Sequence, residues 1–328
     1  MRIQKSAGIS AILLMLTAAV CHQAVRCSIL TAGKRCLTVL IPSLYFFSML
    51  SVFAVRSDGL RALCGKKGLP LGILLFSQIG GYPVGAQLLH EAARSGEICK
   101  EDEKRLLCVC FGCGPGFLLG TVCSGLPLHL TLWVMLSVML PNLLLAPLFL
   151  RGFQPKECKP PKLPFVQLLT GTAESAADAM LKITAMILAF AALMGLLEGL
   201  NLFTLLSEQT AQTIRSLLEV SCVTELLQVG GTLPTAAACL SFGGICVHLQ
   251  LAAITGGMDW LRFLLTRLCT SAMTYLICFA GMKWLFCGVT SVFLPAVQPQ
   301  WTTGSILPGA CLLLMSVMLL RTGTRTSH

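Results

Sequence analysis

The stretch Phe76-Ser77-Gln78-Ile79-Gly80-Gly81-Tyr82-Pro83-Val84-Gly85-Ala86-Gln87 lies inside an apolar segment, 69–91, and decides the fold. Its adjacent glycines interrupt one short helix. Pro83 can begin the next helix, because its fixed φ and missing N–H suit a first helical turn. The free N–H groups at that new helix start carry a partial positive charge that attracts an anion. We therefore expect a broken, re-entrant hairpin at membrane depth; a kinked helix packed through its glycines is the alternative.

The whole chain has the composition of a membrane protein. Its 328 residues are 55% hydrophobic and only 12% charged, whereas soluble domains carry about 25% charged residues. A helix needs about 20 apolar residues to cross a bilayer. Apolar length, turn residues and loop charge together predict eight spans. These spans are 7–25, 36–55, 106–124, 129–150, 180–200, 232–254, 263–287 and 304–320.

The basic residues predict the topology. The net charge of +10 comes from short clusters between apolar segments, so we do not expect nucleic-acid binding. With a cytoplasmic N-terminus and a retained first helix, most of these clusters fall inside, as the positive-inside tendency requires. A cleaved signal peptide is the alternative for the first helix. Arg26, Lys34 and Arg35 disagree, because they would lie outside. The loops expected inside are 56–68, 92–105, 151–179 and 255–262.

The order of segments repeats in two halves. Each half contains a span, a broken hairpin, a glycine-interrupted span and another span. The hairpin 69–91 would enter from inside and the segment 217–229 from outside. Interrupted helices in halves of opposite orientation are typical of transporters with inverted repeats. We predict an all-α, polytopic transmembrane bundle with inverted repeats and two re-entrant hairpins. Its parts are an N-terminal region 1–35, a first repeat 36–164, a second repeat 165–290 and a C-terminal region 291–328.

Polar and helix-breaking residues at the interruptions are the candidate substrate-binding residues. Ionisable groups at membrane depth are costly and are functional candidates by default. Glu219 would bind a coupling cation, a proton or a substrate hydroxyl; alternatively, 205–229 lies at the interface and its acids are simply wet. His248 would carry a proton or only complete a hydrogen bond. The candidates are Ser77, Gln78, Gly80, Gly81, Tyr82, Pro83, Gln87, Gly114, Pro115, Glu219, Ser221, Thr224, Glu225, Gly243, Gly244, His248 and Gln250.

Motifs for other chemistry are missing from the sequence. It contains no P-loop, H-E-x-x-H, G-x-S-x-G or dinucleotide fingerprint, so we predict no enzyme, no catalytic residue and no cofactor. Cys108, Cys110 and Cys113 form a C-x-C-x-x-C run that leads into glycines and a proline. This context favours helix packing over a metal site. The polar connections 92–105 and 151–164 are too short to fold as ATP-driving domains, so a transporter would be secondary or driven by a partner.

Six short sequence segments follow one another along residues 36–290 and are informative together. They are Gly80–Gln87, Arg94–Ile98, Glu103–Leu107, Gly114–Phe117, Leu218–Ser221 and Ser241–Gln250. The sequences of these segments and their order resemble those of the YlbJ-type sporulation integral membrane proteins. These proteins are part of the wider nucleoside-recognition or gate-domain group. The chain departs from that family at Gln87, where the family usually has Lys. It also departs at Cys110–Cys113, where the family has a more polar run.

The resemblance implies a multi-pass protein of the bacterial cell membrane, at the outer forespore membrane of the mother cell. It implies secondary transport of dipicolinic acid during sporulation. Dipicolinate is a small aromatic dianion, which would suit helix N-termini at Pro83 and Pro115. The partners would be the lipid bilayer, this solute, a coupling ion or proton, and other copies or other sporulation membrane proteins. The alternatives are a nucleoside or other small-solute permease of the same fold and a non-transporting structural subunit.

Overall fold

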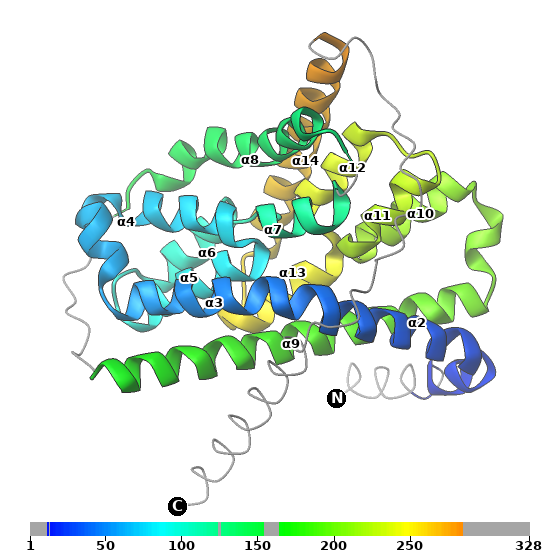
Figure 1. Cartoon of the computed structure of the whole chain (residues 1–328), viewed down its shortest axis with the longest axis horizontal. Coiled ribbons are helices and arrows are strands. Elements are labelled where there is room, and N and C mark those ends of the chain that lie inside the picture. Colours follow the sequence, from blue (N-terminus) through cyan, green and yellow to red (C-terminus); the bar gives the residue numbers. More distant parts are fainter. Residues whose placement is uncertain (1–11, 13, 124–125, 154–163, 285–328) are drawn as a thin grey trace, which may run out of the picture.

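The computed structural model describes residues 12, 14–123, 126–153 and 164–284, and within these ranges the regular structure is entirely helical (Figure 1). This confirms the predicted all-α bundle. The elements of the first half are α2 (His22–Arg35), η1 (Cys36–Leu40), α3 (Ile41–Arg56), α4 (Gly59–Gly80), α5 (Tyr82–Arg94), α6 (Lys100–Leu107), α7 (Pro115–Phe117), η2 (Leu118–Val122) and α8 (Leu128–Leu150). Those of the second half are α9 (Phe165–Gly199), η3 (Leu202–Leu205), α10 (Glu208–Leu218), η4 (Val220–Cys222), α11 (Val223–Gln228), α12 (Leu233–Phe242), α13 (Gly244–Thr255) and α14 (Trp260–Trp284).

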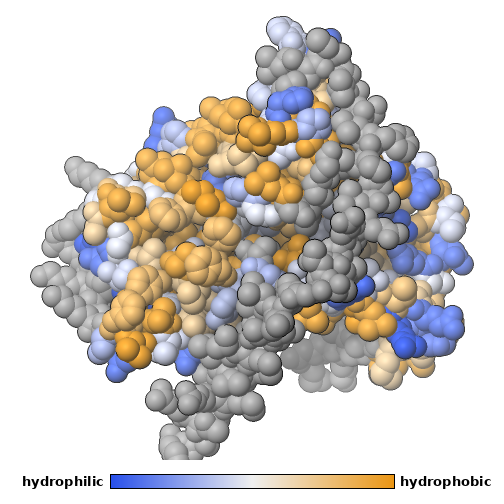
Figure 2. All heavy atoms as spheres, viewed as in Figure 1, coloured by the Kyte–Doolittle hydropathy of each residue, from blue (hydrophilic) through white to orange (hydrophobic). Residues whose placement is uncertain are grey.

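Four helical segments are long and apolar enough to cross a membrane, and a bent pair raises the number to five among the residues described. The four are α8, α9, the α12–α13 pair and α14. Their outer faces carry exposed leucines, such as Leu132, Leu136 and Leu144 on α8. Figure 2 shows that apolar residues cover much of the visible face of the bundle. An apolar surface of this extent indicates a lipid environment, so the chain is a polytopic membrane protein.

The region of Arg26, Lys34 and Arg35 was predicted as a loop, but it is helical. These residues lie in α2, which continues through the π-helical turn η1 into α3. Pro42 explains the π-turn, because a proline has no N–H to donate and its ring crowds the carbonyl of the preceding turn. The first helix, expected at 7–25, instead bends by 94° between Leu14–Val20 and His22–Leu40.

Helix α9 lies along α2 and α3 in the opposite direction, which Figure 1 shows as two long rods side by side. Near one end, Gly195 packs against the backbone of Val25 and Gly199 against Cys21. Near the other end, Tyr45 Oη donates to the carbonyl of Ala173 (3.4 Å). Glycines at such contacts let two helix backbones approach closely.

Three other boundaries also differ from the prediction. The segment 106–124 is not a continuous span, because α6 ends at Leu107 and residues 111–114 have no regular structure. Its glycines and proline cannot sustain a helix. The loop 56–68 already contains the start of α4 at Gly59, and the loop 151–179 contains the first turns of α9. The predicted span 304–320 and residues 7–11 of the predicted first span lie outside the described residues.

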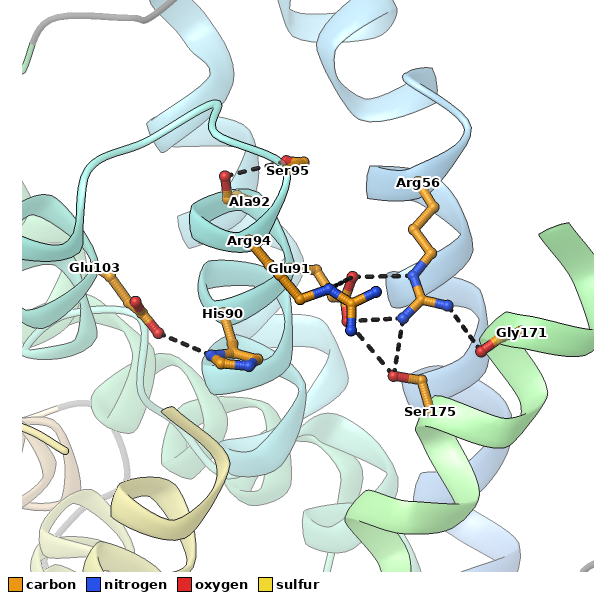
Figure 3. A network of polar contacts seen from close by, with 9 residues as sticks. All are labelled: Arg56, His90, Glu91, Ala92, Arg94, Ser95, Glu103, Gly171 and Ser175. Atoms are coloured by element: carbon orange, nitrogen blue, oxygen red, sulfur yellow. Dashed lines mark hydrogen bonds and ion pairs between the residues drawn. The ribbon is translucent and has the colours of Figure 1, made fainter. Parts of the chain in front are cut away.

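A polar network joins α3, α5 and α9 where they approach one end of the bundle (Figure 3). Arg56 donates through Nε and Nη2 to the two carboxylate oxygens of Glu91 (2.9 and 2.8 Å). Its Nη1 donates to the carbonyl of Gly171 (2.8 Å), and its Nη2 also contacts Ser175 Oγ (3.2 Å). A planar guanidinium that binds a carboxylate in this two-pronged way fixes both partners. The network therefore holds three helices in register.

Glu97, in the turn between α5 and α6, is a buried acid. It is 2% exposed, and its Oε1 has no hydrogen-bond partner in the described chain. Burial raises the pKa of Glu97, with Asp58 adding to this effect and Arg61 opposing it. A raised carboxyl pKa means that ionisation costs stability above that pKa, and that this cost is absent below the pKa of the unfolded chain.

We expect Glu97→Gln to stabilise the protein at pH 7 by on the order of 1 kcal/mol, since the substitution removes a buried charge. The gain should shrink as the pH falls through the folded-state pKa of Glu97. Thermal unfolding of the purified variant and parent in the same detergent at several pH values measures this. A gain that is the same at all pH values would show that the charge is not its cause.

Candidate functional site

The first break is built as the sequence predicts. Helix α4 ends at Gly80, Gly81 adopts φ 93° and ψ 179°, and α5 begins at Tyr82 with Pro83 in its first turn. A side chain rarely tolerates such a positive φ, so glycine is required at position 81. The backbone of Gly114 lies directly against this break: a Cβ added to Gly114 would approach Gly81 N and the carbonyl of Ile79 to 2.9 Å. The interruptions of 69–91 and 106–124 therefore meet.

The breaks of the second half meet at the same place. Helix α12 ends before Gly243 (φ 87°), and α13 begins at Gly244 (φ 73°). Gly244 packs against the backbone of the 218–220 stretch, where a Cβ would lie 3.0 Å from Val220 N. Tyr82, from the first half, donates its hydroxyl to the carbonyl of Leu240 near the end of α12 (2.5 Å). Broken segments from both halves thus converge.

A small cavity of about 40 Å³ lies between these breaks. Its volume suffices for a few water molecules, since one water needs about 10–15 Å³. It is far below the roughly 300–1,000 Å³ of pockets for organic ligands. An organic solute would therefore enter only after the breaks separate. The candidate residues that line the cavity are Gly81, Tyr82, Pro83, Gly114, Glu219, Ser221 and Gln250.

Glu219 is the acidic residue of this cavity wall. It is 5% exposed, so Glu219 is not simply wet, as the alternative expected of both acids in 205–229. Its Oε2 accepts hydrogen bonds from the backbone N–H of Ser221 (3.0 Å) and from the Ser221 hydroxyl. Its Oε1 has no hydrogen bond from any residue that the structure describes. Glu225 differs, because its side chain is 35% exposed and forms an ion pair with Arg35 (2.6 Å). Glu219 is therefore the stronger candidate for binding.

The predicted residue Gln78 lies behind the break rather than in the cavity wall. Its Nε2 donates to the carbonyls of Val109 (3.3 Å) and Phe111 (3.4 Å). Asn142, on α8, donates to the carbonyl of Phe111 as well (2.7 Å). Carbonyls freed by a broken helix at membrane depth need such donors. Gln78 and Asn142 therefore stabilise the irregular segment between α6 and α7.

Arg267, on α14, completes this support and was missed by the sequence analysis. It is fully buried, and its Nη2 donates to Asn142 Oδ1 (2.9 Å) and to the carbonyl of Cys108. The guanidinium lies 4.4 Å from the ring centre of Phe111 and 5.7 Å from that of Phe263. In the described part of the chain it has no carboxylate partner. An arginine inside an apolar span is a functional candidate by the rule that selected Glu219, so a signal for Arg267 was present.

The remaining candidates contact neighbouring protein groups outside the central cavity wall. Ser77 donates to the carbonyl of Leu74 (2.6 Å), and Gln87 accepts a hydrogen bond from Ser48. His248 Nε2 lies 2.8 Å from the carbonyl of Phe242, which is the hydrogen-bonding role considered for it. The other candidates outside the wall are Gly80, Pro115, Thr224, Glu225, Gly243 and Gly244. Pro115 begins α7, which continues into the π-helical turn η2, but Pro115 itself does not line the central cavity.

The cysteine run does not form a cluster with other metal ligands. Cys108, Cys110 and Cys113 are buried free thiols that belong to the hydrophobic core. The described residues contain no group of three or more His, Cys, Asp or Glu side chains that could hold a metal ion. The run therefore contributes packing between the broken segment and its neighbours in this structure.

The chain matches no family model, no curated protein and no solved structure.

Proposed function

We propose that this membrane protein is a secondary transporter of a small organic anion. The central cavity between the broken helices is the binding site in an occluded conformation, and rearrangement of the breaks opens it to either side. The resemblance to the YlbJ-type family supports dipicolinate as the solute and the outer forespore membrane as the location. Glu219 would bind the coupling proton or cation, because it is the acid in the wall of the central cavity.

One observation carries this proposal: interrupted segments from both halves of the chain meet around one small cavity inside an apolar bundle, and the wall of this cavity includes the acid Glu219. Backbone groups released by broken helices are costly in a membrane unless they line a cavity or meet other protein groups. Transporters of this architecture place substrate and coupling-ion sites at such interruptions.

Uptake of radiolabelled dipicolinate into liposomes that contain the purified protein tests the proposal. We expect uptake above protein-free liposomes, and a loss of at least about tenfold for Glu219→Gln, equivalent to roughly 1.4 kcal/mol in the rate-limiting step. Glu101→Gln is the matched control, since Glu101 is 81% exposed on α6 and remote from the cavity wall. Full uptake by Glu219→Gln would remove this residue from the mechanism.

The same liposomes separate the rival functions. If uridine or another neutral solute is taken up, and dipicolinate is neither transported nor competes with it, the substrate is a nucleoside or another neutral solute and not an organic anion. A folded protein that transports none of these solutes alone, and restores flux only when reconstituted with a second membrane protein, would identify a subunit. Folding is checked by the elution volume and the thermal unfolding midpoint of each preparation.

A further inference from the structure

A second, larger cavity of about 410 Å³ lies between α2 and α9. Its volume falls in the range of about 300–1,000 Å³ that organic ligands occupy. Ala24 and Glu198 contribute to its wall. Arg35, eleven residues after Ala24 in α2, and Ile187, eleven residues before Glu198 in α9, do so as well. Because a helix rises 1.5 Å per residue, the cavity extends over roughly 16 Å along α2. It is large enough for an aromatic carboxylate, which the central cavity is not.

The two cavities share part of their walls. Glu219, Ser221 and Ile187 line both of them. The short segment that contains Glu219 and Ser221 therefore separates the larger cavity from the central one. A solute in the larger cavity needs only a displacement of this segment to reach the central site.

Arg35 is the basic residue in the wall of the larger cavity. Its Nη1 donates to Ser221 Oγ (2.8 Å) and its Nη2 to Glu225 Oε1 (2.6 Å). Of the acids around this cavity, Glu225 pairs with Arg35 and Glu198 pairs with Arg215 (3.3 Å), whereas Glu219 accepts hydrogen bonds from Ser221. A guanidinium offers several N–H donors in a plane, which matches the geometry of a carboxylate.

The Arg35–Glu225 pair is suited to exchange. Its side chains are 29% and 35% exposed, whereas those of Arg56 and Glu91 are 16% and 7% exposed. Partly hydrated ion pairs contribute little net stability, because water screens them and solvates the released charge. A ligand carboxylate can therefore replace Glu225 at Arg35 at low cost. The Arg56–Glu91 pair, with its additional contacts to α9, is fixed by comparison (Figure 3).

We infer that the larger cavity is an outer binding site for a carboxylate-bearing solute, in which the solute replaces Glu225 as the partner of Arg35. Arg35 also holds Ser221, so the exchange loosens the segment between the two cavities. The solute then passes from the outer site to the central one. This inference rests on the proposed transport function and adds to it the residue that recognises the anion.

Cys27 provides a direct measure of occupancy, because it lines the larger cavity and is exposed. The purified full-length protein is treated with N-ethylmaleimide, and modification of each cysteine is followed by peptide mass spectrometry. We expect pyridine-2,6-dicarboxylate to slow modification of Cys27 several-fold. Cys269, exposed on α14 and absent from the cavity wall, is the internal control and should react at an unchanged rate.

Three variants identify the group that binds. Arg35→Gln should abolish the protection of Cys27, and Arg35→Lys should weaken it, because a lysine lacks the planar fork. Glu225→Gln should lower the concentration needed for half-protection several-fold, since it removes the competing carboxylate. This third variant keeps Arg35 and serves as the test if Arg35→Gln does not fold.

The outcomes separate this inference from the proposed function. Failure of pyridine-2,6-dicarboxylate to protect Cys27 in a preparation that transports it would overturn the outer site alone. Protection of Cys27 without any uptake would overturn the proposed transport function, while the outer binding site would stand. Equal protection by the neutral pyridine-2,6-dicarboxamide, or by the cation benzylamine, would also overturn the inference, because Arg35 would then not select for a carboxylate.

Discussion

Arg56→Met should lower the free energy of unfolding by about 3–5 kcal/mol, the cost of leaving a buried charge without its partner. The charge left behind is that of Glu91, whose side chain is 7% exposed. Arg94 compensates little, since its Nε lies 3.9 Å from Glu91 and its side chain is 65% exposed. The carbonyl of Gly171 loses its donor as well. The midpoint of thermal or SDS-induced unfolding in detergent measures the loss.

A double variant shows whether the unpaired charge is the cause. Arg56→Met combined with Glu91→Leu removes both charges, and replacing both partners by apolar groups is often nearly neutral. We therefore expect the double variant to recover most of the stability lost in the single one. Lys104→Met is the control for an ordinary ion pair: Lys104 and Glu101 are 41% and 81% exposed, so its effect should stay below about 1 kcal/mol. A double variant as unstable as Arg56→Met would assign the loss to packing instead.

The parts of the fold that could be predicted from the sequence are those decided by local chemistry. Gly81, Gly243 and Gly244 break their helices because few other residues take the required backbone angles, and both breaks are present. The spans at 129–150 and 263–287 follow from apolar length and coincide closely with α8 and α14. These features need no knowledge of which helices become neighbours.

The predictions that were wrong or missing concern long-range packing, or a loop that was expected where the sequence has no residue to stop a helix. Arg35 was placed in a loop, yet nothing between Gly33 and Pro42 stops a helix, and the chain bridges Pro42 with a π-turn. Asn142 and Arg267 reach the first break from α8 and α14. Their arrival depends on the rotation and register of two distant helices. Sequence position alone cannot supply that rotation, although the polarity of both residues inside apolar spans was a visible signal.

The central cavity shows the same division between local and long-range causes. Each break was predictable, and Glu219 was selected because an acid at membrane depth is costly. The sequence alone did not show that Gly81 and Gly114 touch. It also did not show that one short segment forms the wall of two cavities. Contact between the breaks is therefore the feature that most requires a direct test.

Gly114→Ala should separate the two breaks of the first half and destabilise the protein by about 1–3 kcal/mol, the usual cost of adding a methyl group to a packed interior. The backbone angles of Gly114, φ −58° and ψ 153°, suit alanine. The cost must therefore come from contact, since the new Cβ would lie 2.9 Å from Gly81 N and from the carbonyl of Ile79. Both atoms belong to the backbone of the first break, which cannot yield as a flexible side chain would.

Gly116→Ala is the matched control, because a Cβ there meets nothing within 4 Å. Since alanine restricts the unfolded chain, we expect this variant to be neutral or stabilised by up to about 1 kcal/mol. The two substitutions add the same methyl group two residues apart, so a difference between their unfolding midpoints reports the contact with the break. Equal midpoints would show that Gly114 does not pack against Gly81. The central cavity would then lack one of its walls, and transport through it would lose its structural basis.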